Sequence, residues 1–288
     1  MAGTVLVTGA ARRLGKTIAL HLSEAGFNIA VHYNTSKDDA EKLCDVIRSS
    51  GRKAFAVYGD LSDPLIASKG LINATMRETT RLVGLVNSAS TFEPDSFESL
   101  GETFYRRQMA VNAEAPLFLT HALHDAIDGP GWVVNLIDTK IDVLTPDFFS
   151  YTLSKMALEN ITRLTAQACA PKLRINAVAP GLVLRSGNQT QETFEREHDR
   201  IPLGVGPTAE HIAETVTFLA KVPSMTGQIV AVDGGRHFYT PSALVNEFEV
   251  PKGKEAENKE ADSPAIKESP RSGGLSAALA AGRRKDGS

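Results

Sequence analysis

The chain has 288 residues, of which 42% are hydrophobic, and its 31 Lys and Arg against 34 Asp and Glu give a formal net charge of −3. This length and composition suit one sizeable core, and the charge argues against a nucleic-acid surface, which carries a strong basic excess. The cysteines, Cys44 and Cys169, lack metal-ligand spacing, so no metal site is predicted and both are interpreted as core thiols of a reducing compartment.

The N-terminus begins almost directly on "TVLVTG" and shows no basic segment followed by a long apolar stretch. No apolar run reaches the roughly 18 residues that a membrane-spanning helix needs. A cytoplasmic protein without a membrane partner is therefore expected.

Short apolar runs alternate with longer helical patterns along most of the chain, which predicts a parallel sheet covered by helices on both faces. The runs are 5–8, 29–32, 53–58, 82–86, 131–137, 174–178 and 228–232. Helices over 14–25 and 38–50 are expected to end at Gly26 and Gly51, because glycine tolerates a left-handed cap. The expected fold class is therefore α/β, a doubly wound Rossmann-type sheet of about seven strands in one domain, residues 1–247.

Residues 248–288 differ in composition from the rest of the chain, with mixed charges, several Pro, Gly and Ser, and few apolar side chains before residue 275. Such a segment buries too little apolar surface to offset its chain entropy, so a disordered charged tail is predicted. The last stretch, "GLSAALAAGRRK", is compatible with a short helix, either a fraying extension or a docking peptide.

The N-terminal stretch "TVLVTGAARRLGKTIALHLSEAG" begins as a strand, turns at Gly9 and becomes a helix near Leu14. Gly9 and Gly15 permit a tight turn and a close approach of the backbone to a ligand. The following helix presents unpaired N–H groups and the positive end of its dipole. This order of strand, turn and helix predicts a pyrophosphate-binding site.

The second strand ends in "IAVHYNTSKDD", where an NAD-preferring fold usually places an acidic residue. The position is filled here by Tyr33, Asn34, Thr35 and Ser36. Arg13, with Arg12 and Lys37 as weaker candidates, would attract a 2′-phosphate. NADPH is therefore predicted over NADH, although these side chains are also compatible with a solvated loop.

Two further strand ends are expected to face the cofactor crevice. "GDLSD" after the third strand places Asp60 and Leu61 where an adenine could rest. "VNSAS" after the fourth strand places Asn87 and Ala89 at the same edge of the sheet.

Tyr151 and Lys155 lie four residues apart in "YTLSK", so on a helix both side chains reach the same place. An ammonium near a phenol is expected to lower the pKa of the phenol toward working pH, as a proton donor requires. By itself, this spacing would equally fit an ordinary surface pair.

Asp138 follows the fifth predicted strand, upstream of Tyr151. A carboxylate cannot donate a hydrogen bond to a substrate carbonyl unless it is protonated, and it repels a developing oxyanion. Asp138 therefore argues against simple carbonyl chemistry. It suits a task in which it orients Tyr151, relays a proton to it or accepts from substrate N–H groups; the alternative is a capping residue at a strand end.

The ordered motifs together resemble the short-chain dehydrogenase/reductase family over about residues 4–240. They are 8–15, Asp60, "NSAS" at 87–90, Asn112, "YTLSK" at 151–155, "PG" at 180–181 and "VDGG" at 232–235. The resemblance implies a Rossmann-type fold, a nicotinamide cofactor and often a tetramer built through helices near 102–125 and 151–169. It also implies catalytic roles for Asn112, Tyr151 and Lys155, while Asp138 stands where the family generally has serine.

Within the family, Asp138, the arginine in "TGAARRLG" and "NSASTFEP" resemble the pteridine reductases and the dihydromonapterin reductases. This resemblance implies that a pterin ring is surrounded by Arg13, Ser90, Phe92, Asp138 and Tyr151. It further implies that Lys155 holds the nicotinamide ribose. Pro180 and Gly181 would line the nicotinamide, Phe92 would stack on the pterin, and 182–194 would form the substrate loop.

The resulting expectation is an NADPH-dependent homotetrameric reductase that converts a 7,8-dihydropterin to the tetrahydro form. Dihydromonapterin is the preferred substrate, with dihydrobiopterin and dihydrofolate possible. One alternative is a carbonyl reductase of the same family that acts on an oxoacyl or sugar substrate. Another is a weakly catalytic cofactor-binding scaffold that uses its tail.

Overall fold

The computed structural model describes residues 3–185 and 189–238. Within these ranges a single sheet of seven parallel strands has the order β3-β2-β1-β4-β5-β6-β7. The strands are β1 (Thr4–Val7), β2 (Asn28–Tyr33), β3 (Ala54–Tyr58), β4 (Leu82–Asn87), β5 (Gly131–Leu136), β6 (Leu173–Pro180) and β7 (Ile229–Val232). The predicted fold class and strand number are confirmed, whereas the predicted tail, 248–288, lies outside the described residues.

The strands form because short runs rich in Val, Ile and Leu are buried on both faces, as parallel strands require. All residues of β1 and β5 are buried. The predicted strand ends differ from the observed ones by at most two residues. β6 shows the largest extension, since it continues through Pro180.

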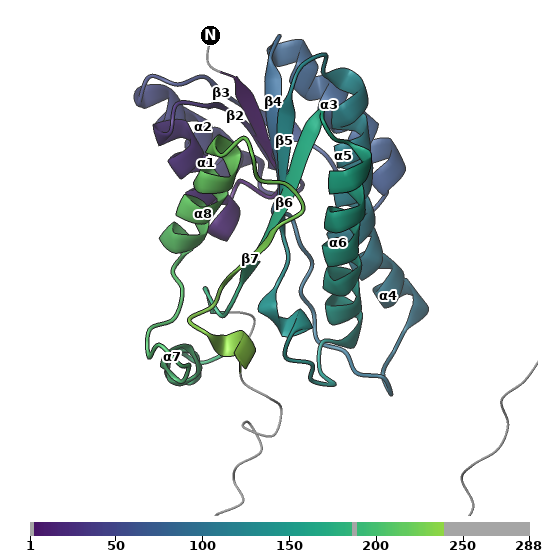
Figure 1. The fold of residues 1–288 in the computed structure, drawn as a ribbon, viewed down its shortest axis with the longest axis vertical. Coiled ribbons are helices and arrows are strands. Elements are labelled where there is room, and N and C mark those ends of the chain that lie inside the picture. Colours follow the sequence, from purple (N-terminus) through teal and green to yellow (C-terminus); the bar gives the residue numbers. More distant parts are fainter. Residues whose placement is uncertain (1–2, 186–188, 239–288) are drawn as a thin grey trace, which may run out of the picture. The chain divides into compact units, whose positions relative to one another are not determined.

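Helices cover the sheet in two layers (Figure 1). One layer consists of α1 (Arg13–Glu24), α2 (Lys37–Ser49) and α8 (Ala209–Lys221), and the other contains α3 (Pro64–Glu78), α5 (Ala115–Ala126) and α6 (Phe149–Ala168). Each layer buries its own apolar cluster against the sheet. Gly26 and Gly51 follow α1 and α2 with positive φ, as predicted.

The remaining helical elements lie near the carboxyl ends of the strands or lead into α5. They are α4 (Glu102–Met109), the π-helical turn η1 (Ala110–Glu114), α7 (Gln191–Asp199) and the short 3-10 turns η2 (Thr139–Ile141) and η3 (Arg236–Phe238). The segments α4, η1 and α5 follow one another without a break, and the N–H of Ala115 bonds to the carbonyl of Ala110, five residues earlier. This insertion places Asn112 inside the helical segment.

The order of the strands reverses direction along the sheet between β1 and β4. In open parallel sheets, ligands bind at the carboxyl edge next to such a switch point. The fold therefore brings the glycine turn after β1, Asn87 at the end of β4 and Asp138 after β5 to one edge. Among the described helices, none has the length and apolar character needed to cross a membrane.

Candidate active site

The glycine turn after β1 has space only for glycine at two positions. Gly9 has a φ of +62°, and a Cβ there would lie 2.9 Å from the Cα of Ala89. At Gly15 a Cβ would lie 2.4 Å from the carbonyl oxygen of Gly9. Helix α1 then begins at Arg13 without a side-chain cap. Its first-turn amides and dipole therefore form a site that suits a phosphate group.

Basic side chains surround the start of α1. Arg13 has a φ of +52°, and its guanidinium donates to the carbonyl of Arg185 in the segment after β6 (2.9 Å). Arg12 forms an ion pair with Asp39 on α2. A cavity of about 300 Å³ is lined by Arg12, Arg13, Lys16 and Lys42 together with Asp39. Its charge suits a phosphate beside the end of β2.

The end of β2 carries no acidic residue, as the sequence indicates. Asn34 and Thr35 are exposed, and the Asn34 amide lies 3.4 Å from a carboxylate oxygen of Asp60, which also accepts from the N–H of Ser62. The side chain of Leu61 is not at the surface, because it is 4% exposed and packs in the core with the α3 side chains. The side chain of Leu61 therefore faces the core, and the predicted placement of Asp60 and Leu61 near an adenine stays a prediction.

Asn87 faces the neighbouring strand. Its Nδ2 donates to Oδ1 of Asn135 (2.7 Å), and Asn135 in turn donates to Thr162 on α6 (2.9 Å). Ala89 lies against Gly9, and its N–H donates to the hydroxyl of Thr8 (3.0 Å). Asn87 and Ala89 thus hold the ends of β1, β4 and β5 together beside the crevice.

Tyr151, Lys155 and Asp138 lie together at the edge of the sheet. The phenol of Tyr151 donates to Oδ2 of Asp138 (2.8 Å). Lys155 Nζ lies 5.6 Å from the centre of the Tyr151 ring and donates to the carbonyl of Leu136 (2.8 Å). Tyr151 is 5% and Lys155 3% exposed. Asp138 also caps η2 by accepting from the N–H of Lys140, so the capping contact is present together with the contact to Tyr151.

The expected lowering of the Tyr151 pKa is wrong. Burial, together with the charge and hydrogen bond of Asp138, raises the pKa of Tyr151 well above its ordinary value. Burial also raises the pKa of Asp138 and lowers that of Lys155 to about 8. The phenol therefore holds its proton firmly, beside a carboxyl group whose proton affinity is increased.

Asn112 lies away from this pair and acts on the backbone. It is fully buried and exchanges hydrogen bonds with Thr91, accepting from its N–H (2.9 Å) and donating to its carbonyl (3.0 Å). It also accepts from Ser90 and donates to Ser154 on α6, whose hydroxyl bonds the carbonyl of Tyr151. Asn112 therefore fixes the segment after β4 against α6, and its predicted catalytic role stays a prediction.

Phe92 lies beside Tyr151, as a stacking residue would need. Its ring is 40% exposed and meets the Tyr151 ring edge to face, with centroids 4.7 Å apart. It also stacks on Phe148, with centroids 4.2 Å apart and planes inclined by 9°. Phe148 was not predicted from the sequence as part of the site. Its φ of +53° is unusual for a bulky residue and is a property of the fold rather than of any local motif.

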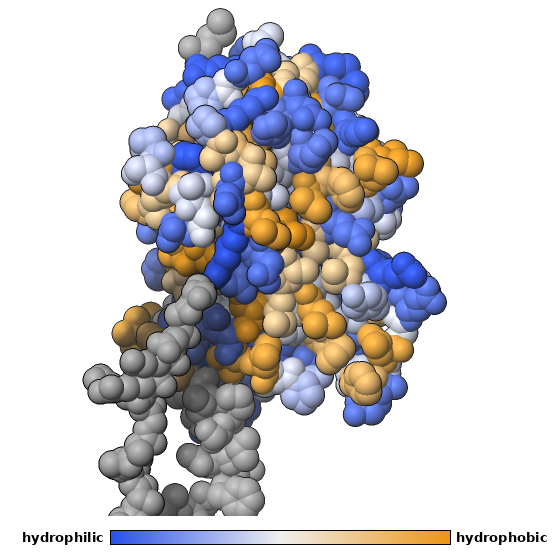
Figure 2. Space-filling model, turned by 45° about the vertical axis from the view of Figure 1, so that its right-hand side comes forward, coloured by the Kyte–Doolittle hydropathy of each residue, from blue (hydrophilic) through white to orange (hydrophobic). Residues whose placement is uncertain are grey.

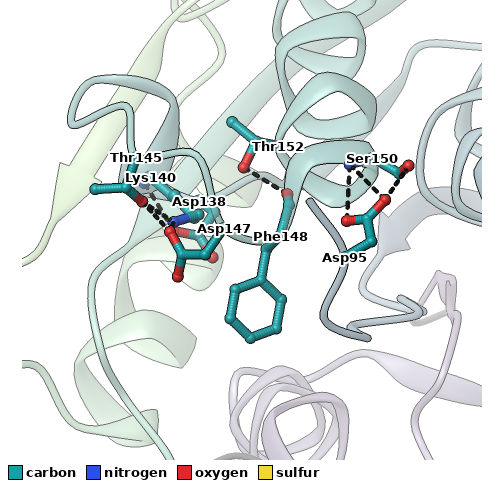
Figure 3. Close-up of polar contacts among 8 residues, drawn as sticks. All are labelled: Asp95, Asp138, Lys140, Thr145, Asp147, Phe148, Ser150 and Thr152. Carbon is teal, nitrogen blue, oxygen red and sulfur yellow. Dashed lines mark hydrogen bonds and ion pairs between the residues drawn. The ribbon is translucent and has the colours of Figure 1, made fainter. Parts of the chain in front are cut away.

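Two polar clusters hold Phe148 at the start of α6 (Figure 3). On one side, Lys140 bonds to Thr145 and Asp147. On the other side, Asp95 accepts hydrogen bonds from both the N–H and the hydroxyl of Ser150. The segment between β5 and α6 is thus shaped by side-chain contacts around a partly exposed aromatic pair.

Pro180 and Gly181 end β6 at the same edge of the sheet. The carbonyl of Pro180 accepts from the Thr139 hydroxyl (3.2 Å), and a Cβ at Gly181 would lie 2.8 Å from the Cβ of Asp233. The predicted substrate loop, 182–194, includes 186–188, which are outside the described residues, and its end forms the start of α7.

Comparison with known proteins supports one family. The model described as Enoyl-(Acyl carrier protein) reductase matches residues 9–237. An uncharacterized oxidoreductase of Methylorubrum extorquens is 33% identical, over 80% of this chain and 96% of its own. Pteridine reductase 1 of Leishmania tarentolae is 30% identical, over 81% and 96%. A dihydromonapterin reductase of Klebsiella pneumoniae is 27% identical, over 81% and 95%.

A solved structure, FolM alternative dihydrofolate reductase 1 from Brucella canis complexed with NADP, is 39% identical with a TM-score of 0.79. It covers 87% of this chain and 96% of its own. A different activity is also represented. The 3-oxoacyl-[acyl-carrier-protein] reductase FabG of Staphylococcus aureus is 29% identical, over 82% of this chain and 99% of its own.

Proposed function

The chain belongs to the short-chain dehydrogenase/reductase family and is an oxidoreductase, and we propose that it uses NADPH to reduce a 7,8-dihydropterin to the tetrahydro form. Dihydromonapterin is the preferred substrate, and dihydrobiopterin and dihydrofolate are secondary ones. The observation that carries this proposal is the hydrogen bond from the Tyr151 phenol to Asp138.

The residues around the glycine turn fit NADPH. The turn is compact, because a Cβ at Gly9 would clash with Ala89 and a Cβ at Gly15 with the carbonyl of Gly9, and the first turn of α1 has no side-chain cap. The basic cavity with Arg12, Arg13 and Lys16 suits the 2′-phosphate, as does the absence of an acidic residue at the end of β2. When bound, NADPH supplies a hydride.

Reduction of a pterin C=N bond adds a hydride to carbon and leaves the ring nitrogen in need of a proton. Tyr151 donates its phenolic proton to that nitrogen, and Asp138 returns a proton to the phenolate and takes another from solvent. The raised pKa of Asp138 favours this relay, because a carboxyl group with an ordinary pKa carries few protons at pH 7. The positive charge of the Lys155 ammonium stabilises the negatively charged phenolate during the transfer.

Phe92 contributes a flat apolar surface next to Tyr151. A pterin stacked on this ring would gain roughly 0.5–1.5 kcal/mol beyond its area burial. Phe148, which lies against the same ring, keeps Phe92 in its orientation. The exposed hydroxyl of Ser90 and the guanidinium of Arg13 supply polar groups for the substrate or the cofactor.

The deciding experiment follows NADPH oxidation at ~340 nm with dihydromonapterin, dihydrobiopterin, dihydrofolate and an acetoacetyl thioester. We expect turnover of a pterin, and a fall of at least roughly tenfold in the Asp138→Ser variant because the relay is lost. Asp142→Ser is the matched control, because Asp142 is an exposed carboxylate at the end of the same 3-10 turn. Turnover of the thioester alone would contradict the proposal.

A carbonyl reductase is the second candidate, favoured by the similarity to FabG and by the description of the matching family. In that reaction Asp138 is less suited than a serine, because it donates to a carbonyl only when it is protonated and repels a developing oxyanion when it is ionised. The same substrate panel separates the two candidates. Turnover of the thioester by the unsubstituted protein, unchanged in Asp138→Ser, would support this second candidate.

We also propose a homotetramer. Helices α4, α5 and α6 form the face that Figure 2 brings forward, and apolar patches alternate with polar ones there. On α6, Leu153 is 37% and Leu164 67% exposed. Light scattering after gel filtration would test the assembly, and Leu164→Glu is expected to shift it toward smaller species, since a buried charge opposes association.

A further inference from the structure

His32 is a buried histidine that the proposed chemistry does not use. It lies within β2, is 2% exposed and binds backbone groups through both ring nitrogens. The N–H of Gly9 donates to Nδ1 (2.9 Å), and Nε2 lies 3.0 Å from the carbonyl oxygen of Gly59. A backbone N–H can only donate and a carbonyl can only accept, so Nδ1 is unprotonated and Nε2 carries the hydrogen.

The same residue also holds the next amide of the glycine turn. The carbonyl of His32 accepts from the N–H of Ala10 (3.1 Å). Two successive amides of the turn are therefore bonded to one residue of the neighbouring strand. The amides of Gly9 and Ala10 are therefore occupied, and the amides at the start of α1 remain for phosphate. His32 thereby determines which amide of the turn is the first one available for phosphate.

The other ring nitrogen reaches a second cofactor-facing segment. Gly59 follows β3 and precedes Asp60, the residue predicted to lie near the adenine. Space there is tight, because a Cβ at Gly59 would lie 2.8 Å from Leu71. The imidazole therefore joins the predicted pyrophosphate and adenine segments through a single rigid ring.

We propose that His32 is a positioning residue for NADPH, which sets the spacing between the glycine turn at Gly9 and the segment at Gly59. This inference rests on the proposed cofactor but not on the pterin substrate. His32 acts through Gly9 and Gly59 and does not take part in hydride or proton transfer. Its substitution therefore changes the affinity for NADPH and leaves the chemical step intact.

Two variants separate the two ring contacts. In His32→Asn, the side-chain oxygen takes about the place of Nδ1 and continues to accept from Gly9. In His32→Gln, the amide reaches toward Gly59 but offers Gly9 no acceptor. We expect the Kd of NADPH, measured by fluorescence without any pterin, to rise about tenfold in His32→Gln and less than about threefold in His32→Asn.

Steady-state rates distinguish a role in NADPH binding from a general loss of structure. In both variants kcat at saturating NADPH should stay within about twofold of the unsubstituted protein, while KM for NADPH follows the Kd. Val31→Ala is the control. Val31 is the fully buried neighbour of His32 on β2, and shortening its side chain leaves the hydrogen bonds of the turn intact. It should lower the melting temperature without raising the Kd. Equal Kd values in His32→Gln and the unsubstituted protein would overturn the proposal.

A measurement on the unsubstituted protein covers the case in which a variant does not fold. Hydrogen exchange should show the amides of Gly9 and Ala10 protected without NADPH, and amides at the start of α1 gaining protection when NADPH is added. The reverse, with Gly9 and Ala10 protected only by NADPH, would overturn the proposal, because they would then bind phosphate instead of His32. Absence of NADPH binding to the unsubstituted protein would instead contradict the proposed function.

Discussion

The glycine-turn side of the crevice, built by β1, β2 and β3, differs from the β5–α6 side in what holds its functional groups. On the first side, backbone amides bond to the buried side chains of Thr8 and His32. On the second side, exposed or partly exposed side chains such as Phe92, Phe148 and Lys140 bond or stack with one another. Single side-chain substitutions should therefore alter the second side more than the first.

The largest effect is expected for Tyr151→Phe, which removes the proposed proton donor and leaves the glycine turn untouched. Turnover of a dihydropterin should fall by about 10²- to 10⁴-fold, as measured by steady-state NADPH oxidation. The Kd of NADPH, measured by fluorescence titration, should change by less than about twofold. If binding and turnover fall together, the two sides of the crevice are coupled and the contrast between them is lost.

Phe92→Leu tests whether the substrate side works by stacking. Loss of an aromatic contact of roughly 0.5–1.5 kcal/mol should raise KM for the pterin by roughly 2- to 12-fold and leave KM for NADPH unchanged. Phe97→Leu is the control, because Phe97 is 70% exposed and packs on Phe149 instead of Tyr151. An equal rise in both variants would argue against stacking by Phe92.

Asp95→Ala tests the side-chain support of the β5–α6 segment. The carboxylate binds the N–H and hydroxyl of Ser150 and so works as a cap supplied to α6 from a distant loop. Its loss should reduce the free energy of unfolding by about 1 kcal/mol, as for other helix caps, in urea denaturation. Asp142→Ala is the control, and equal stability of the two variants would show that the contact with Ser150 contributes little.

The smallest effect is a shift in a pH profile. Because burial lowers the pKa of Lys155 to about 8, the lysine loses its charge as the pH rises through that value, and kcat/KM for NADPH should decline there. The charge of Asp138 raises the pKa of Lys155. Asp138→Asn should therefore move the midpoint of the decline to lower pH. An unchanged midpoint would show that the charge of Asp138 does not influence the pKa of Lys155.

Much of the cofactor side could be predicted because its determinants are local. Gly9 and Gly15 follow a buried strand and precede a helix, and this order is visible in the sequence. The proximity of Asp138 and Tyr151 was also predictable, since a strand end and the following helix meet at one edge of a parallel sheet.

The features that escaped prediction depend on the tertiary structure. The position of Phe148 depends on its left-handed backbone and on its contact with the ring of Phe92, which is distant in sequence. The pKa of Tyr151 is governed by burial, which the spacing to Lys155 does not reveal. His32 reads as an ordinary residue of a strand, because its partners Gly9 and Gly59 belong to other segments.

The π-helical turn at Ala110–Glu114 has a further consequence for the helical segment that contains it. An α-helix advances by about 100° per residue, so one inserted residue turns everything that follows by about that angle. The segment before the insertion packs on α6, and the segment after it packs on α3 as well. Deleting one residue from this turn would rotate Leu119 and Leu123 off the sheet, so the length of this turn determines the phase of the whole of α5.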